Sequence, residues 1–175
     1  YVLRAKAKLR DASAEFALYG LAGDALAENG IEATGTPWQR GSKGEASVVS
    51  LYPADGVKRA LWIAPAGTPA PVGPELDLGL WQWGEVRSGV AMLTTPVLDA
   101  FVPQMVNYES IGGVNFKKGC YPGQEVVARS QFRGTLKRRA YLMQADAAVS
   151  AGQEVFAAGD AEQPVGTVVE AAQGP

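Results

Sequence analysis

A single cysteine is the clearest candidate for chemistry in this sequence. Cys120 lies within Lys117-Lys118-Gly119-Cys120-Tyr121-Pro122-Gly123 and is the only cysteine among 175 residues. The adjacent lysines favour a thiolate over a thiol, as does the positive end of a helix expected to begin with Pro122. Two interpretations follow: an exposed, activated thiolate at a turn, or a buried cysteine that packs as a small hydrophobic residue. The residues alone leave both open.

The chain contains no histidine. Ser-His-Asp and Cys-His nucleophile systems are therefore excluded within it, as are zinc sites built on imidazole. One thiol cannot supply the four thiolates of an iron–sulfur cluster, so a cluster would need ligands from another subunit or a thiol cofactor. One cysteine also allows no internal disulfide, which suits a reducing cytoplasm.

Charge is unevenly distributed along the chain. Residues 117–139 hold seven basic side chains against one acidic, a net charge of +6, whereas the rest holds nine against seventeen, or −8. This segment predicts an anionic partner, either RNA phosphates or the carboxylate tail of a small molecule; the alternative is an ordinary solvated surface. A pI near 5.2 argues against a dedicated nucleic-acid-binding domain. No apolar run of about 18 residues exists, so no membrane helix is expected.

The first part of the chain predicts an antiparallel sheet. Alternating residues indicate strands over 2–9, 15–19, 45–52 and 58–64, and the segment 31–44 is typical of a loop. A short helix over 25–28 is expected to end in a left-handed cap at Asn29-Gly30. Leu21, Ala25 and Leu26 would face the core. Together these elements predict an α+β fold, with a helix packed on one face of the sheet.

The second part predicts helices and then short strands. A proline-rich loop at 65–74 precedes a helix over 76–86, and Pro103 marks another helix start. Strands over 136–144, 154–158 and 165–170 indicate part of a small C-terminal β-barrel. We therefore predict an α+β region over residues 1–132 and a partial barrel over 133–175. The chain does not begin with methionine, and we expect it to be part of a longer protein.

The motifs around Cys120 carry a family resemblance. Residues 101–107 read F-V-P-Q-M-x-N, residues 112–125 read G-G-V-x-F-x-K-G-C-Y-x-G-Q-E, and V-A-R follows at 127–129. This pattern resembles the YgfZ group of GcvT-like folate-binding proteins, most strongly over residues 101–139. The resemblance implies a GcvT-like middle domain and a site for tetrahydrofolate.

The resemblance also implies a role. Relatives are related to the aminomethyltransferase of glycine cleavage and are linked to assembly or repair of iron–sulfur enzymes, including the one that methylthiolates tRNA. The expected function is thus a cytoplasmic folate-binding accessory protein rather than an enzyme, with iron–sulfur proteins or a tRNA-modifying enzyme as partners. Direct nucleic-acid binding and membrane binding are not expected.

The same resemblance assigns site residues. Cys120 would be the reactive group and Lys118 would stabilise its thiolate. The expected folate-binding residues are Gly119, Tyr121, Gly123, Gln124, Glu125 and Arg129; no metal site is expected. The glycines would let the ligand approach the backbone, the carboxamide and carboxylate would bind the pterin or orient the loop, and the basic residues 129–139 would bind the glutamate tail.

Three alternatives remain. An aminomethyltransferase-like enzyme that transfers a one-carbon group from tetrahydrofolate would need a positioned carboxylate and no thiol. An RNA- or protein-binding module would use the basic segment, with binding that weakens steeply with salt. Finally, the Cys120 segment could be a purely structural turn.

Overall fold

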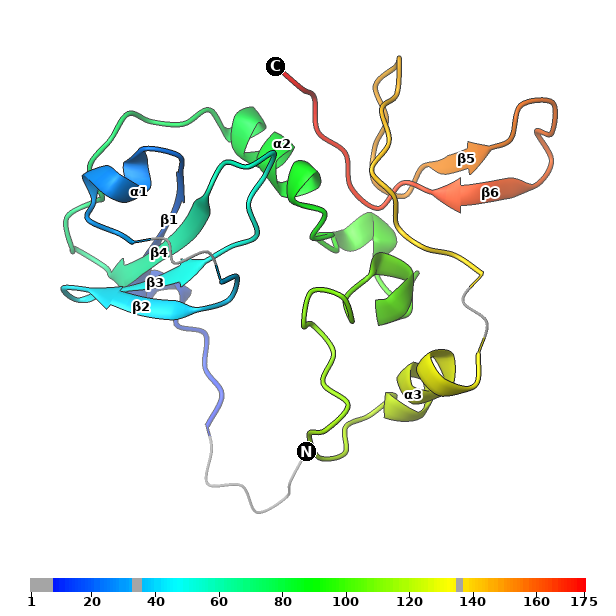
Figure 1. Cartoon of the computed structure of the whole chain (residues 1–175), viewed down its shortest axis with the longest axis horizontal. Coiled ribbons are helices and arrows are strands. Elements are labelled where there is room, and N and C mark those ends of the chain that lie inside the picture. The colour runs from blue at the N-terminus through cyan, green and yellow to red at the C-terminus, as the bar shows by residue number, and fades with distance from the viewer. Residues whose placement is uncertain (1–7, 33–35, 135–136) are drawn as a thin grey trace. The chain divides into compact units, whose positions relative to one another are not determined.

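The structure, a computed structural model, describes residues 8–32, 36–134 and 137–175. The chain divides into two compact units, Tyr1–Glu75 and Leu76–Pro175. Figure 1 shows the helices and strands of both units. The strand predicted over residues 2–9 lies almost wholly outside the described residues.

The first unit is built on a four-stranded antiparallel sheet (Figure 1). Its strands are β1 (Phe16–Ala22), β2 (Arg40–Lys43), β3 (Ala46–Ser50) and β4 (Arg59–Pro65), in the spatial order β1-β4-β3-β2. A short 3-10 helix, η1 (Ser13–Glu15), precedes β1, and the helix α1 (Ala25–Glu28) follows it. The predicted α+β fold with an antiparallel sheet is confirmed.

The core of this unit lies between α1 and one face of the sheet. Val48 of β3 and Trp62 of β4 are register partners and are both buried, together with Leu21 and Leu26. Burial alternates along β3 and β4 because successive side chains of a strand point to opposite faces. The predicted positions of Leu21 and Leu26 in the core are confirmed, and α1 ends as expected, with Gly30 in the left-handed region at φ 63°.

The prediction of a loop over 31–44 is wrong at its end, where the structure has strand β2. Every residue from Arg40 to Lys43 is exposed, and none is a large apolar residue. The segment becomes a strand because its backbone pairs with β3, from Arg40 opposite Val49 to Lys43 opposite Ala46. An edge strand of this kind has no buried face, so it carries no hydrophobic alternation to detect.

The second unit holds the remaining elements. These are α2 (Leu78–Ser88), the 3-10 helices η2 (Thr95–Val97) and η3 (Pro103–Val106), α3 (Gln124–Phe132), and the antiparallel strands β5 (Glu154–Phe156) and β6 (Pro164–Thr167). The predicted helix over 76–86 is confirmed with a small shift. Its start is set by Asp77, whose Oδ1 accepts hydrogen bonds from the backbone N–H groups of residues 79 and 80 at 2.8 and 3.2 Å, and its end by Gly89 at φ 72°.

The prediction of a strand over 136–144 is wrong for the described residues 137–144, because these residues form no helix or strand. A strand is stabilised through its hydrogen-bonded neighbour, and β5 and β6 pair only with each other. The C-terminal barrel and the border between residues 132 and 133 stay predictions.

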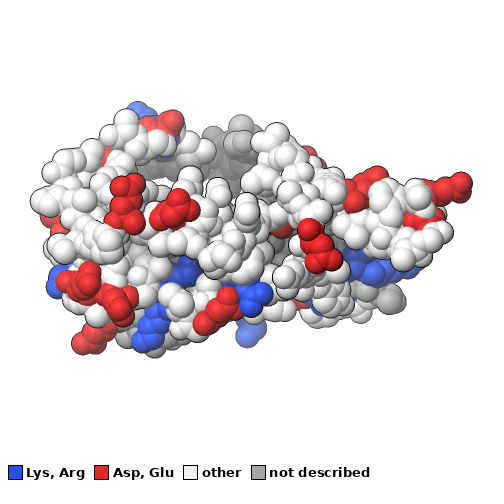
Figure 2. Space-filling model, turned by 90° about the horizontal axis from the view of Figure 1, so that it is seen from above, with Lys and Arg blue, Asp and Glu red and all other residues white. Residues whose placement is uncertain are grey.

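Charges of both signs cover the surface. Acidic side chains are spread over the face in Figure 2, and the net charge of the chain is −2. The basic residues of the segment 117–139 all lie on the surface of the second unit.

Candidate functional site

Cys120 lies in the loop that leads into α3, and its side chain is exposed. This exposure excludes the interpretation that the cysteine packs as a small hydrophobic core residue. An exposed thiol on a turn can react with a soluble electrophile or disulfide without prior unfolding. The accessibility that the site hypothesis requires is therefore present.

Side-chain amides hold the loop on both sides of Cys120. Asn115 Oδ1 accepts hydrogen bonds from the backbone N–H groups of Lys117 at 2.8 Å and Lys118 at 3.1 Å. Gln124 Oε1 accepts one from Tyr121 N at 3.3 Å. An Asn side chain that binds the backbone two residues later fixes a tight turn. These bonds fix the backbone of the loop 115–123 before and after Cys120.

Lys118 contacts an aromatic ring. Its Nζ lies over the ring of Tyr121, 4.6 Å from the ring centroid. This cation–π contact holds the ammonium group beside the stretch that carries Cys120, because the two partners lie on either side of the cysteine in sequence. The expected action of Lys118 on the thiolate stays a prediction.

The helix after Cys120 starts later than predicted. Pro122 was expected as the first helical residue, but α3 begins at Gln124 and Gly123 is its N-cap. Gly123 has φ 80°, a left-handed conformation that other residues adopt only with strain. The glycine, rather than the proline, therefore sets where α3 begins.

The other predicted residues lie around this turn. A Cβ on Gly119 would meet no heavy atom within 4 Å. Gln124 is half-buried, Glu125 is exposed in the first turn of α3, and Arg129 is exposed in its last turn. The structure thus brings Lys118, Tyr121 and Gln124 into contact through the loop, and leaves Glu125 and Arg129 on the outside of the helix.

Sequence reasoning missed Gln104 as part of this region. Its side chain in η3 is 0% exposed, and its Nε2 donates a hydrogen bond to the carbonyl oxygen of Val127 in α3 at 2.7 Å. Gln104 therefore attaches the helix that follows Cys120 to η3. Its Oε1 is buried and has no hydrogen-bond partner among the described residues. No local pattern indicates this contact, which spans 23 positions.

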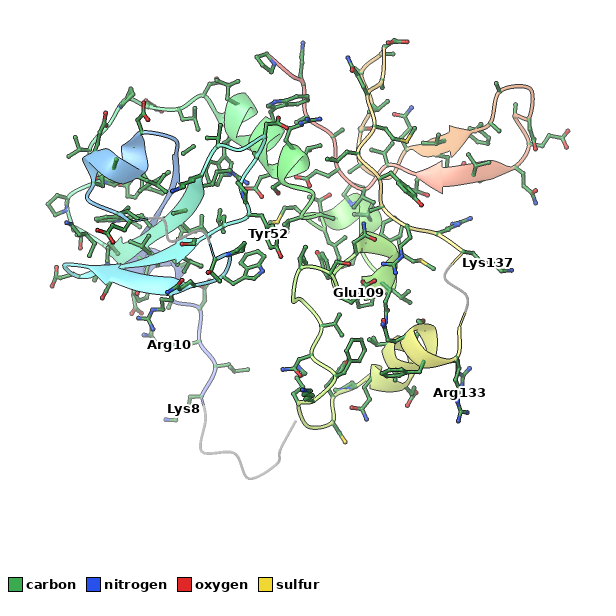
Figure 3. All side chains as sticks on the ribbon, in the orientation of Figure 1. Lys8, Arg10, Tyr52, Glu109, Arg133 and Lys137 are labelled. Atoms are coloured by element: carbon green, nitrogen blue, oxygen red, sulfur yellow. The ribbon has the colours of Figure 1, made fainter. Side chains whose placement is uncertain are left out.

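Arg139 is also a structural residue, although the sequence grouped it with the free basic side chains. Its NH1 donates to the backbone oxygen of Gln104 at 3.0 Å and to Asn107 Oδ1 at 3.1 Å, and it forms an ion pair with Glu109. Asn107 Nδ2 in turn donates to Ala140 O at 2.9 Å. Figure 3 shows Glu109 in the interior of the second unit, in contrast to Arg133 and Lys137. Arg139 thus links residues 104, 107 and 109 within the second unit, and its expected role at the folate tail stays a prediction.

Tyr108 forms a separate hydrogen bond within the second unit. Its hydroxyl donates to Ala91 O at 2.7 Å. Burial raises the pKa of Tyr108 above the usual 10.0, and the negative charge of Glu170 raises it further. The neutral phenol is therefore the form that this part of the fold requires.

The two best-defined hollows of the described residues lie away from the motif. One hollow of about 160 Å³ is lined by β2, β3 and the segment 30–32, and another of about 400 Å³ by residues 156–161. Tetrahydrofolate needs both a concave site for its pterin and cations for its tail. The motif offers an exposed cation in Arg129 and the half-buried ring of Tyr121.

The described part of the chain offers neither a cluster of metal ligands nor a membrane-spanning helix. No group of three or more His, Cys, Asp or Glu side chains is placed to hold a metal ion. No helix there has the length and hydrophobicity that crossing a membrane requires.

Comparisons with known proteins identify relatives. The chain is 39% identical over 71 residues to a protein of Edwardsiella ictaluri named "tRNA-modifying protein YgfZ". The match covers 41% of this chain and 22% of the relative. It is 36% identical over 98 residues to the protein of that name from Aliivibrio fischeri, and the match covers 54% of this chain and 31% of the relative. It is 41% identical over 63 residues to the protein of that name from Cronobacter sakazakii, and the match covers 36% of this chain and 19% of the relative.

The chain therefore spans about a fifth to a third of the length of these curated relatives. No family model matches it. The matches confirm the resemblance that the motif around Cys120 indicated. Over the matched residues, the chain is similar to proteins named YgfZ.

Proposed function

We propose that this chain is part of a cytoplasmic, folate-binding accessory protein that supports the assembly or repair of iron–sulfur enzymes, including an enzyme that methylthiolates tRNA. Cys120 is its reactive group. The observation that carries this proposal is an exposed thiol in a loop held by Asn115 and Gln124, in a chain related to proteins named as tRNA-modifying.

The loop geometry gives each residue a role in the proposal. Lys118, held over Tyr121, supplies positive charge near the thiol, and Gly123 allows α3 to start directly after the turn. Arg129 binds the carboxylates of the folate tail, since it is exposed on α3. The pterin occupies a concave site that residues beyond the motif complete.

Alkylation of Cys120 tests this proposal directly. Because the chain has one thiol, iodoacetamide labels one site, and mass spectrometry follows the rate across neutral pH with and without tetrahydrofolate. We expect labelling of the folded chain and a slower rate with tetrahydrofolate. Lys118→Met should slow alkylation more than Lys117→Met, a control that removes the same charge but no contact with Tyr121.

Two results would contradict the proposal. If tetrahydrofolate leaves the alkylation rate unchanged and does not bind in calorimetry, the folate assignment is wrong. If both lysine variants behave alike, Lys118 has no special relation to the thiol. One-carbon transfer needs no thiol, so transfer activity that persists in Cys120→Ser would favour the aminomethyltransferase alternative.

A further inference from the structure

The second unit presents a strongly basic surface around α3. Its exposed cations lie in the loop before α3, in the helix and just beyond it: Lys117, Lys118, Arg129, Arg133, Lys137 and Arg138. Glu125 is the one acidic residue between positions 117 and 138. None of the six cations forms an ion pair with a described residue, whereas Arg139 pairs with Glu109. Six exposed cations on this basic surface therefore face a single acidic residue.

Exposed aromatic rings lie among these cations. Phe132, the last residue of α3, is 72% exposed, and Phe116 is 43% exposed. Their ring centroids are 5.6 Å apart at an interplanar angle of 66°. This edge-to-face contact joins the Cys120 loop to the end of α3, so that loop and helix form one surface. Most of the Phe132 ring stays in solvent, where it gains nothing from burial.

The spacing along α3 adds to the argument. Arg129 lies in the last turn of α3, and Arg133 is the C-cap residue four positions later, directly after Phe132. Two like charges at this spacing repel one another. Figure 3 shows Arg133 and Lys137 projecting outward from the unit. An anionic ligand would relieve this repulsion.

We infer that the basic surface around α3 binds single-stranded RNA, with its cations on the phosphates and a base stacked on Phe132. Exposed aromatic side chains interleaved with cations suit unpaired bases, which are free to stack, and not a closed duplex. A folate tail would use one or two of the six cations and no exposed phenylalanine. The acidic pI of the whole chain does not oppose this inference, because the acidic residues lie mainly outside the segment 117–139.

This inference does not depend on folate binding or on the reactivity of Cys120. Its test measures fluorescence anisotropy of the 175-residue chain with a short labelled single-stranded RNA, and with the same RNA annealed to its complement, over a salt series. We expect tighter binding to the single strand. Binding should weaken with salt, with a slope of roughly 0.7 per phosphate contact in a log–log plot.

Matched variants locate the surface. Arg133→Glu with Lys137→Glu should weaken binding and reduce the salt slope by about 1.4, because two contacts are lost. The control Lys8→Glu with Lys43→Glu changes the net charge by the same amount, at exposed positions of the first unit. It should leave the affinity and the salt slope unchanged. Phe132→Ala should weaken binding by about fivefold or more. Phe156→Ala, at a ring 42% exposed on β5, should have no effect.

Several results would overturn the inference: no binding at low salt, tighter binding to the duplex, equal loss in the two charge-reversed variants, or full affinity in Phe132→Ala. Binding of dextran sulfate that is as tight as that of the RNA, and that weakens in the same charge-reversed variant, would mean that the surface attracts any polyanion. Far-UV circular dichroism checks that each variant is folded. Tetrahydrofolate binding, measured separately on Phe132→Ala, distinguishes failure of this inference from failure of the proposed function.

Discussion

The buried amide of Gln104 gives a sharp test of how α3 is attached. Gln104→Met keeps the length of the side chain but loses the hydrogen bond to Val127 O, a net cost of about 1 kcal/mol. It also removes Oε1, a buried acceptor without a partner among the described residues, which recovers about 1–3 kcal/mol. Val127 O keeps its helical partner, since α3 continues beyond residue 131. The free energy of unfolding should therefore be unchanged or rise by up to about 2 kcal/mol.

Two comparison variants make the prediction specific. Gln104→Ala leaves a cavity as well as losing the bond and should cost about 2–4 kcal/mol. Gln104→Glu places a carboxylate in a fully buried site and should cost more than about 3 kcal/mol. Urea unfolding followed by far-UV circular dichroism measures all three. If Gln104→Met costs as much as Gln104→Ala, then Oε1 has a partner in solution and the reasoning is wrong.

Three further predictions concern the same unit. Gly123→Ala should cost about 1 kcal/mol of stability because its φ is 80°, whereas Gly119→Ala, with no positive φ and open space, should stay within about 0.5 kcal/mol; equal losses in urea unfolding would contradict this. Arg139→Met should destabilise by about 1–2 kcal/mol because it leaves the Glu109 carboxylate unpaired, and adding Glu109→Gln should restore part of that loss in a double-mutant cycle. The free energy of unfolding should fall as pH rises above about 10, because the folded state raises the pKa of Tyr108 and unfolding therefore releases its proton. Tyr108→Phe should lessen this fall, and a variant with the same dependence of stability on pH above about 10 would refute the prediction.

Local patterns predicted the elements that bury a face. Strands β1, β3 and β4 and helices α1 and α2 lie close to their predicted positions, because alternation, helical spacing and glycine caps are local signals. The helix α3 was predicted, but its first residue was not, because a proline and a glycine both mark starts and only the backbone angle of Gly123 distinguishes them. Strand β2 has no local signal at all.

The sequence by itself determined which groups can react. It supplied one thiol, excluded histidine chemistry, and located the basic segment and the motif that the YgfZ relatives confirm as a family resemblance. These conclusions depend only on which residues are present and in what order. Side-chain chemistry and family motifs are properties of the chain itself.

Only the tertiary structure decided which of these groups are accessible. It exposed Cys120 and held Lys118 over Tyr121, and it showed that Arg139 is paired with Glu109. Gln104 contacts α3 across 23 positions and Arg139 contacts η3 across 35. Such contacts depend on where packing brings distant segments together, and no local pattern in a sequence records that position.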